Sequence, residues 1–296
     1  MSSLQPQASA QPAIGIIGGS GLYDIEGLEQ RREITVETPF GDPSDQIVGG
    51  VLEDRPVFFL PRHGRGHRIL PNELNHRANI HALRSLNVRW IIAVTAVGSL
   101  REQYAPRDIL VPHQLFDRTS RREHHTFFGN GIAAHIAFSD PYSDGLRRIL
   151  LDAARAEHRH AVHDGGTYVN MDGPAFSTRA ESETNRKLGF DIIGMTNLPE
   201  AKLAREAEIA LATLAMITDY DCWKVDEESV NAQTVVGHLM ANAEAAKRIV
   251  KQAVARIPAE ADWPEHSALS GAVLTPRDLW PADTATRLEL LLQNQP

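Results

Sequence analysis

The sequence predicts an α/β fold built from a single domain. Between Ala13 and about Pro258, short apolar runs of strand type alternate with helical patterns, and the composition does not change along the way. These runs are almost wholly apolar, which indicates strands of a sheet covered on both faces. We expect a disordered tail over residues 1–12, one domain over 13–280 and a C-terminal tail over 281–296.

Each expected element follows from a local pattern. Apolar runs ending at Gly, Pro, Thr or Asp predict strands at 13–17, 57–60, 90–94, 108–111, 167–169, 191–193 and 209–217. Apolar stripes at helical spacing predict helices at 72–86, 143–157, 178–187, 199–207 and 229–256. Asn72 is the expected cap of the first helix, and Pro199 is expected to open the fourth, since proline favours the first helical turn. The last ~30 residues are proline-rich and predict no clear element.

Composition narrows the class of protein. The chain has 296 residues with a formal net charge of −8, which argues against general nucleic-acid binding because that needs a basic face. The sequence holds no apolar stretch long enough to span a bilayer, and residues 1–12 lack the apolar core of a signal peptide. The single cysteine, Cys222, is expected to be a buried thiol and fits a reducing cytoplasm.

The segment from Ala215 to Trp223 is the most informative part of the chain. An apolar run ends at Asp219 and Asp221, and side chains two apart in an extended chain point to the same face. Ligands of open α/β sheets bind beyond the carboxyl ends of strands, so both acids are expected in one pocket. Two acids suit a ligand that has N–H groups and a ring nitrogen that must gain a proton, as adenine has. The alternative is a loop whose aspartates cap the next helix.

Hydroxyl and cationic side chains follow several other predicted strands. A glycine loop carries Ser20, and the later strand ends carry Arg62, His63, Thr95 and Thr196. Hydroxyls, backbone N–H groups and a bidentate arginine are typical donors to phosphate. Met195, before Thr196, would provide an adaptable apolar floor for a sugar ring. Each residue alone also has a structural explanation as a turn, cap or core residue, but together they predict a site for an anion beside a base.

Other site types fit the sequence less well. The glycine loop matches neither GxxxxGK[ST] nor the dinucleotide pattern GxGxxG. A zinc site would have to use His124, His125 and His135, and the chain has neither HExxH nor CxxC. The Gly-x-Ser-x-Gly pattern of serine hydrolases is absent too. We therefore predict a site that uses no metal and no covalent nucleophile.

Several long motifs resemble the methylthioadenosine phosphorylase branch of the trimeric purine nucleoside phosphorylases. They run in order from about Ile14 to Ala253: IGIIGGSGLYD, TPFGDPSD, PRHGRGHRILPNELNHRAN, TAVGSLRE, GTYVNMDGPAFSTRAES, MTNLPEAKLAREA and TDYDCWK. The resemblance implies a nucleoside phosphorylase-like domain with a central mixed, partly barrel-like sheet flanked by helices. It also implies a homotrimer, or a hexamer, in the cytoplasm.

The resemblance implies a role for each motif residue. The implied phosphate site consists of Ser20, Arg62, His63, Thr95, Ala96 and Thr196. The implied nucleoside site consists of Met195 under the ribose, Phe176 and Ser177 along the base, Asp219 and Asp221 at the base, and His135 from a neighbouring subunit. Inorganic phosphate is then a co-substrate, and no cofactor is needed.

Two positions distinguish adenine nucleosides from 6-oxopurine nucleosides. The 6-oxopurine branch has asparagine where this chain has Asp219, and a proton-sharing aspartate suits adenine. That branch also has a histidine for the ribose 5′-hydroxyl where this chain has Ala232, with Val235 one turn on. His238, roughly 240° further round the helix, does not replace that histidine. The small apolar wall admits a 5′-methylthio group, although the family's usual valine is replaced by the smaller Ala232.

The resemblance therefore predicts reversible phosphorolysis of 5′-methylthioadenosine to adenine and 5-methylthioribose 1-phosphate, which would serve purine and methionine salvage. Asp219 is the expected proton donor, supported by Asp221, because burial beside a second carboxylate raises a carboxyl pKa toward neutrality. Three alternatives remain at this point. They are a broader phosphorylase of adenosine, inosine or methylthioinosine, a non-catalytic sensor, and a hydrolase that uses water.

Overall fold

The computed structural model describes residues 11–19, 22–120, 122–224, 232–260 and 262–293, with only the backbone of 232–241. The strands are β1 Ala13–Gly18, β2 Glu29–Ile34, β3 Ile47–Leu52, β4 Arg55–Pro61, β5 Val88–Ser99, β6 Ile109–Val111, β7 Gln114–Asp117, β8 Val162–Asp164, β9 Thr167–Asn170, β10 Ile192–Gly194 and β11 Ala210–Asp219. The α-helices are α1 His76–Ser85, α2 Asp144–Ala156, α3 Arg179–Lys187, α4 Asn197–Glu206, α5 Ala232–Arg256, α6 Ala282–Arg287 and α7 Glu289–Leu292.

The strands form one mixed sheet that branches at the long strand β5. Its main path runs β2-β3-β4-β1-β5-β10-β9-β7, while β11 pairs with β5 and leads on to β6 and β8. The central pairs β4–β1, β1–β5 and β5–β11 are parallel, so their carboxyl ends lie at one edge. The expected α/β fold with a mixed central sheet between helices is confirmed, and the branch brings the end of β10 beside those of β5 and β11.

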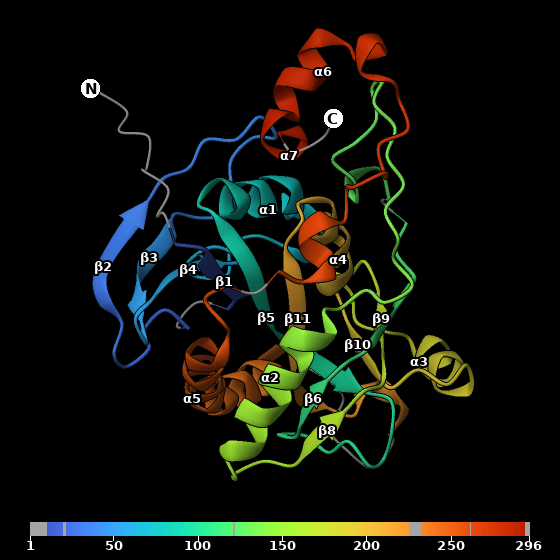
Figure 1. Cartoon of the computed structure of the whole chain (residues 1–296). Coiled ribbons are helices and arrows are strands. Elements are labelled where there is room, and N and C mark those ends of the chain that lie inside the picture. The colour runs from blue at the N-terminus through green and yellow to red at the C-terminus, as the bar shows by residue number, and fades with distance from the viewer. Residues whose placement is uncertain (1–10, 20–21, 121, 225–231, 261, 294–296) are drawn as a thin grey trace.

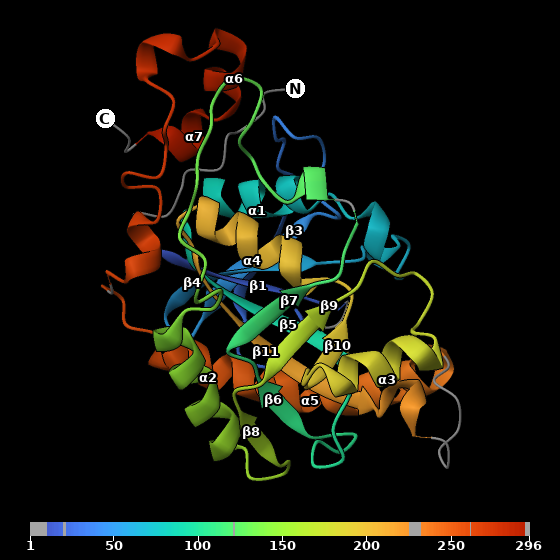
Figure 2. The same ribbon diagram turned by 90° about the vertical axis from the view of Figure 1, so that its right-hand side faces the viewer.

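Helices cover both faces of the sheet (Figures 1 and 2). Helices α2 and α5 pack on one face, where alternate residues such as Ile14, Ile16 and Trp90 meet them in a large core cluster. Helices α1 and α4 pack on the other, against Ile17 and Ile91. Because both faces are buried, the central strands have the continuous apolar runs that the sequence shows.

Two helix starts differ from the prediction. Helix α1 begins at His76 after a separate 3₁₀ turn over Pro71–Glu73, and its cap is Asn75, whose side chain accepts from the Ala78 N–H, rather than Asn72. Helix α4 begins two residues before Pro199, which still lies in its first turn. Both predicted helix starts are displaced by a few residues. A second Asn can cap α1, and a buried Asn197 begins α4, and spacing alone does not distinguish such neighbouring start positions.

Four strands have no counterpart in the prediction. They are β2, β3, β7 and β8. Strand β2 is polar and almost wholly exposed, β3 contains two glycines, and β7 and β8 have four and three residues. Short, exposed or glycine-containing strands lack the apolar run on which the prediction depends.

The two ends of the chain differ in what the structure describes. Most of the expected tail over 1–12 lies outside the described residues. Residues 281–296, expected to be a tail, contain α6 and α7, and Leu288, Leu291 and Leu292 are buried in the same core cluster as α1. Figure 1 shows this pair of helices beyond α1 at the C-terminal end of the colour scale. Within the described ranges, no helix is both long and apolar enough to cross a membrane.

Candidate active site

Asp219 and Asp221 lie at the end of β11, against the end of β5. The Asp221 N–H donates to Oδ1 of Asp219, with N and O 2.7 Å apart. Asp221 has a left-handed φ of 53°, so a turn brings the two acids together rather than the alternation of an extended strand. On β5, a Cβ at Gly98 would lie 3.0 Å from Asp219 Oδ1. Glycine there leaves room for the Asp219 carboxyl group.

The hydroxyl of Thr218 bonds to the second oxygen of Asp219. Oγ1 of Thr218 lies 2.7 Å from Asp219 Oδ2 and 3.2 Å from the carbonyl oxygen of Val97. A hydroxyl has a single proton to donate. If that proton goes to Val97, the bond to Asp219 requires a protonated carboxyl, which then donates to Thr218. The buried Thr218 can therefore hold Asp219 in either protonation state.

The Asp221 carboxyl group lies in a buried environment. Its side chain is buried, and this burial raises the pKa of its carboxyl, while the hydroxyls of Ser182 and Ser177 oppose the rise. The carbonyl of Ser177 accepts from the thiol of Cys222, with S and O 3.2 Å apart. Phe176 precedes this segment with an exposed ring. The structure thus places Ser177 beside the acid pair.

Arg62 lies at the end of β4 and is almost completely buried. Its backbone N–H donates to Gly18 at the end of β1, 2.9 Å away, and its Nη1 donates to the carbonyl of Val94 on β5, also 2.9 Å away. Glu200, in the first turn of α4, accepts from Nε at 2.5 Å and from Nη2 at 2.9 Å. This bidentate pair fixes the guanidinium plane beside the ends of β1 and β4 and the middle of β5.

Glu200 is the main residue that the sequence analysis missed. It is fully buried, and acidic residues are almost never so buried unless they are paired. The available signal was an acid beside Pro199 at the start of a helix that follows a site strand. That position is also favourable for any exposed acid near a helix N-terminus, so the sequence does not reveal that this one pairs with Arg62.

Thr95 and Thr196 gather around Tyr168 beside Arg62. The Tyr168 hydroxyl faces the Thr95 side chain and the Thr196 backbone, and burial raises its pKa to about 12. Thr196 is the N-cap residue of α4, but its hydroxyl does not cap the helix, and its buried Oγ1 has no hydrogen-bond partner among the described residues. A hydroxyl without a partner at a helix N-terminus suits an anion. Ala96 follows Thr95 along β5.

His63 presents an acceptor rather than a cation. Its Nδ1 lies 2.8 Å from the carbonyl oxygen of Ile69, so Nδ1 carries a proton. Burial, reinforced by the charge of Arg62, lowers the pKa of His63 to about 4. The ring is therefore neutral at pH 7, and Nε2 accepts a hydrogen bond. The sequence predicted a donor to phosphate here, whereas in the chain without ligand the ring offers an acceptor.

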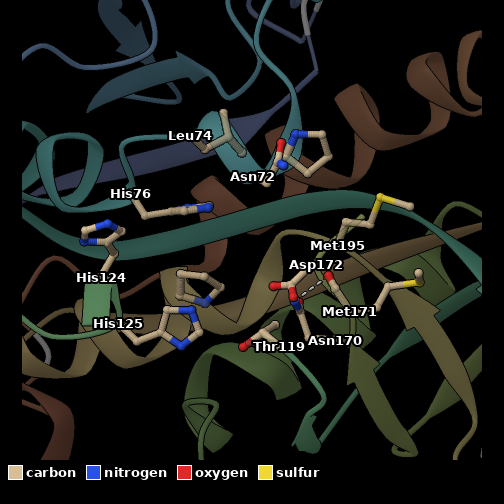
Figure 3. Close-up of a pocket in the computed structure, with 12 residues that line it drawn as sticks. Asn72, Leu74, His76, Thr119, His124, His125, Asn170, Met171, Asp172 and Met195 are labelled. Carbon is tan, nitrogen blue, oxygen red and sulfur yellow. Dashed lines mark hydrogen bonds between the residues drawn. The ribbon is translucent and has the colours of Figure 1, made fainter. Parts of the chain in front are cut away.

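A pocket lined by both polar and apolar side chains adjoins these residues (Figure 3). His76, His124 and His125 gather at one end, and Met171 and Met195 at the other. His76 Nδ1 lies 3.9 Å from Glu200 Oε1, so the pocket borders the back of the Arg62–Glu200 pair. Met195 packs on Gly173, where a Cβ would lie 2.5 Å from its sulfur. In the described part of the chain, no three His, Cys, Asp or Glu side chains are grouped to hold a metal ion.

One predicted residue, His135, lies apart from this group, and the side chains of three others are outside the described part of the structure. The exposed His135 lies on an extended segment, where its N–H donates to Ala272. Ser20 lies outside the described residues. The side chains of Ala232 and Val235 lie outside them too, although α5 begins at Ala232.

Comparison with known proteins identifies the family. The model of the phosphorylase superfamily matches residues 13–255, which include every predicted site residue. The chain belongs to the phosphorylase superfamily. In this phosphorylase, Arg62, Thr196, Asp219 and Asp221 lie at or just after the ends of β4, β10 and β11, and Thr95 lies within β5.

Relatives of this phosphorylase match over nearly the whole chain. S-methyl-5′-thioadenosine phosphorylase of Geobacter sulfurreducens is 51% identical over 95% of this chain and 98% of its own length. The protein of the same name from Chloroflexus aurantiacus is 54% identical over 93% and 95%. A methylthioadenosine phosphorylase from an antarctic soil metagenomic library superposes with a TM-score of 0.91 at 48% identity, covering 96% and 100%. The Schistosoma mansoni methylthioadenosine phosphorylase in complex with adenine gives 0.83 at 38%, covering 91% and 100%.

Proposed function

We propose that the chain catalyses reversible phosphorolysis of 5′-methylthioadenosine to adenine and 5-methylthioribose 1-phosphate. The bond between C1′ and N9 breaks, a phosphate oxygen bonds to C1′, and adenine leaves with a proton. The juxtaposition of two sets of groups carries this proposal. Arg62 and the threonine hydroxyls are the anion-binding set, and the acid pair at the end of β11 is the base-binding set.

The phosphate site is proposed to use Ser20, Arg62, His63, Thr95, Ala96 and Thr196. Arg62 donates through its N–H groups that Glu200 and Val94 do not use. The Thr196 hydroxyl, which has no partner among the described residues, and the N-terminus of α4 add donors without charge. The neutral His63 accepts a hydrogen bond from the P–OH group of monohydrogen phosphate or from a ribose hydroxyl. Bound phosphate stabilises the cationic ribosyl group as the glycosidic bond opens, and then attacks C1′.

The acid pair is proposed to receive the leaving adenine. Asp219, supported by Thr218, gives its proton to N7, so the leaving base does not have to carry the full negative charge. Asp221 accepts from the 6-amino group. Met195 lies under the ribose, and Phe176 and Ser177 line the base. Ala232 and Val235 form the apolar wall for the 5′-methylthio group.

The proposal also covers the oligomeric state, the co-substrate, the metabolic role and the cellular location. His135 would complete the nucleoside site of a neighbouring subunit in a homotrimer, in keeping with its exposed side chain. The reaction needs no metal or organic cofactor, since phosphate is the co-substrate. The product chemistry suits purine and methionine salvage, and the single cysteine suits the cytoplasm.

The deciding experiment is adenine release from 5′-methylthioadenosine, with and without inorganic phosphate, beside inosine and methylthioinosine. We expect fast release from methylthioadenosine that depends on phosphate. Release without phosphate would indicate a hydrolase, and preference for inosine or methylthioinosine would refute the proposed base recognition. Binding of methylthioadenosine without release of adenine would instead indicate a sensor.

A further inference from the structure

His135 lies on an extended arm made of two segments. The arm consists of residues 132–138 and 272–275, which run side by side and are joined by an isolated β-bridge (Figure 1). The N–H of His135 donates to the carbonyl of Ala272 across the arm, 2.9 Å away. A pair of strands joined by so few bonds is at best marginally stable by itself. The arm therefore needs further contacts if it is to hold His135 in one position.

Burial alternates along the first segment of the arm. Alternate side chains of an extended chain point to opposite faces. The face that packs on the core cluster shared with α1 consists of Ile132, Ala134, Ile136 and Phe138. The opposite face is exposed, and its central side chain is the imidazole of His135. The arm is thus attached to its own domain by one face and presents His135 outward on the other.

The C-terminal helices fasten the base of the first segment. The hydroxyl of the buried Thr284 on α6 donates to the carbonyl of Asn130, 2.9 Å away. A Cβ at Gly131 would lie 2.4 Å from Pro281, so the residue before α6 packs directly on this backbone. Helix α7 is anchored in turn by the burial of Leu288 and its neighbours in the core cluster. A chain end tied down in this way can hold another segment in place.

The second segment of the arm is fastened to the same part of the chain. The N–H of Ala133 donates to Oγ1 of Thr275 at 2.8 Å, which links the two segments beside His135. The indole N–H of Trp280 donates to the carbonyl of Thr275, also at 2.8 Å. The Trp280 ring packs against the core cluster that holds α7. Bonds from both segments therefore end on residues 275–284.

We infer that the C-terminal segment 275–293 is a positioning element for the nucleoside site of a neighbouring copy, because it holds the arm that carries His135. The inference rests on the proposed function, in which His135 completes that site. Thr275 and Thr284 do not touch the substrate. They fix the backbone on either side of His135, so that less conformational freedom is lost when the nucleoside binds.

A double variant, Thr275→Val with Thr284→Val, tests the inference. It removes both hydroxyls and keeps the size of the side chains. We expect KM for methylthioadenosine to rise about tenfold, while kcat and KM for phosphate stay unchanged. Amide hydrogen exchange at Ala133 and His135 should become faster. The double serine variant keeps both hydroxyls and should match the wild type, as should Thr286→Val on the exposed side of α6.

Hybrid assemblies test whether the arm acts on a neighbouring copy. The double valine variant is co-expressed with Asp219→Asn chains, whose own sites are slow but whose arms are intact, and assemblies that contain both are isolated with two affinity tags. Intact sites of the valine chains then receive intact arms. The hybrids should show a component with the wild-type KM for methylthioadenosine, at a rate that Asp219→Asn alone does not reach.

Three results would overturn the inference. They are an unchanged KM in the double valine variant, hybrids in which every active site keeps the raised KM, and a fully active wild type that light scattering shows to be a monomer. If the double variant does not fold, Thr284→Val alone goes through the same measurements. Wild-type protein without phosphate-dependent adenine release would refute the proposed function itself, whereas active wild type beside an unaffected double variant would refute only the role of the C-terminal segment.

Discussion

Glu200 accepts from Arg62 with both carboxylate oxygens, and the two side chains are 1% and 3% exposed. The arginine at the centre of the proposed phosphate site is thus already paired with a fully buried acid. The pair has no net charge, so the protein holds a guanidinium in a buried position before any anion arrives. Its remaining N–H groups stay available to phosphate, in an orientation set by Glu200.

Removing the charge of Glu200 should damage both stability and phosphate binding. Glu200→Gln leaves Arg62 buried without a counter-ion, and breaking such a pair costs about 3–5 kcal/mol. We expect KM for phosphate to rise at least about tenfold, measured by initial rates, and the unfolding free energy to fall, measured in urea. Asp24→Asn, which breaks the exposed pair with Arg31, should cost less than about 1 kcal/mol. Equal effects of the two variants would contradict this view of Glu200.

Asp219→Asn should remove the proton that adenine needs. We expect kcat for methylthioadenosine to fall by about 10²–10⁴-fold, the usual contribution of general acid catalysis. Hypoxanthine nucleosides should lose less, since an amide suits their 6-oxo group. Rates on both nucleoside classes under saturating phosphate measure this, and unchanged turnover of methylthioadenosine would exclude Asp219 as the acid.

Thr218 should act on the rate through Asp219. In Thr218→Val, Oδ2 of Asp219 loses its hydrogen bond of 2.7 Å to the Thr218 hydroxyl. We expect kcat to fall about tenfold, with little change in KM for phosphate, because the phosphate site lies on other strand ends. Thr218→Ser keeps the hydroxyl and should recover most of the rate. A serine variant as slow as the valine variant would assign the loss to packing rather than to the hydrogen bond.

His76 should make the fold less stable in acid. Burial lowers its pKa to about 3 in the folded chain, against an ordinary 6.5. The unfolded chain binds this proton below pH 6.5 and the folded chain does not, so stability falls as the pH falls. Between pH 7.5 and 5, His76 should account for about 2 kcal/mol of this loss. Urea unfolding at the two pH values should show a shallower dependence for His76→Gln, and the wild-type dependence for His124→Gln, whose side chain is 62% exposed.

The apolar strands and the residues at their ends were predictable from sequence because both depend on local pattern. The runs that became β1, β5 and β11 are apolar and buried on both faces. Asp219 lies at the end of β11 as expected, whereas β5 continues through Thr95 to Ser99. Strand β2 was not predictable, since its side chains face solvent and its pairing with β3 is a tertiary contact. The same applies to Glu200, whose partner lies 138 residues away in the chain.

The protonation state and local conformation of the site residues could not be predicted from the sequence either. Arg-His at a strand end predicts two donors, yet Ile69 and burial make His63 a neutral acceptor. Two aspartates spaced i, i+2 predict a shared face, but a left-handed turn at Asp221 makes the contact instead. Residue identity and spacing gave the position of the site, whereas protonation depends on the three-dimensional neighbours of each group.

The polar packing of α3 has a consequence for the order in which the molecule opens. Helix α3 buries no apolar side chain, so little hydrophobic free energy opposes its separation from the sheet. It should therefore open as a small cooperative unit at urea concentrations that leave the strands intact. Amide hydrogens of α3 would then exchange faster than those of β5, and catalysis would fail before the fold does.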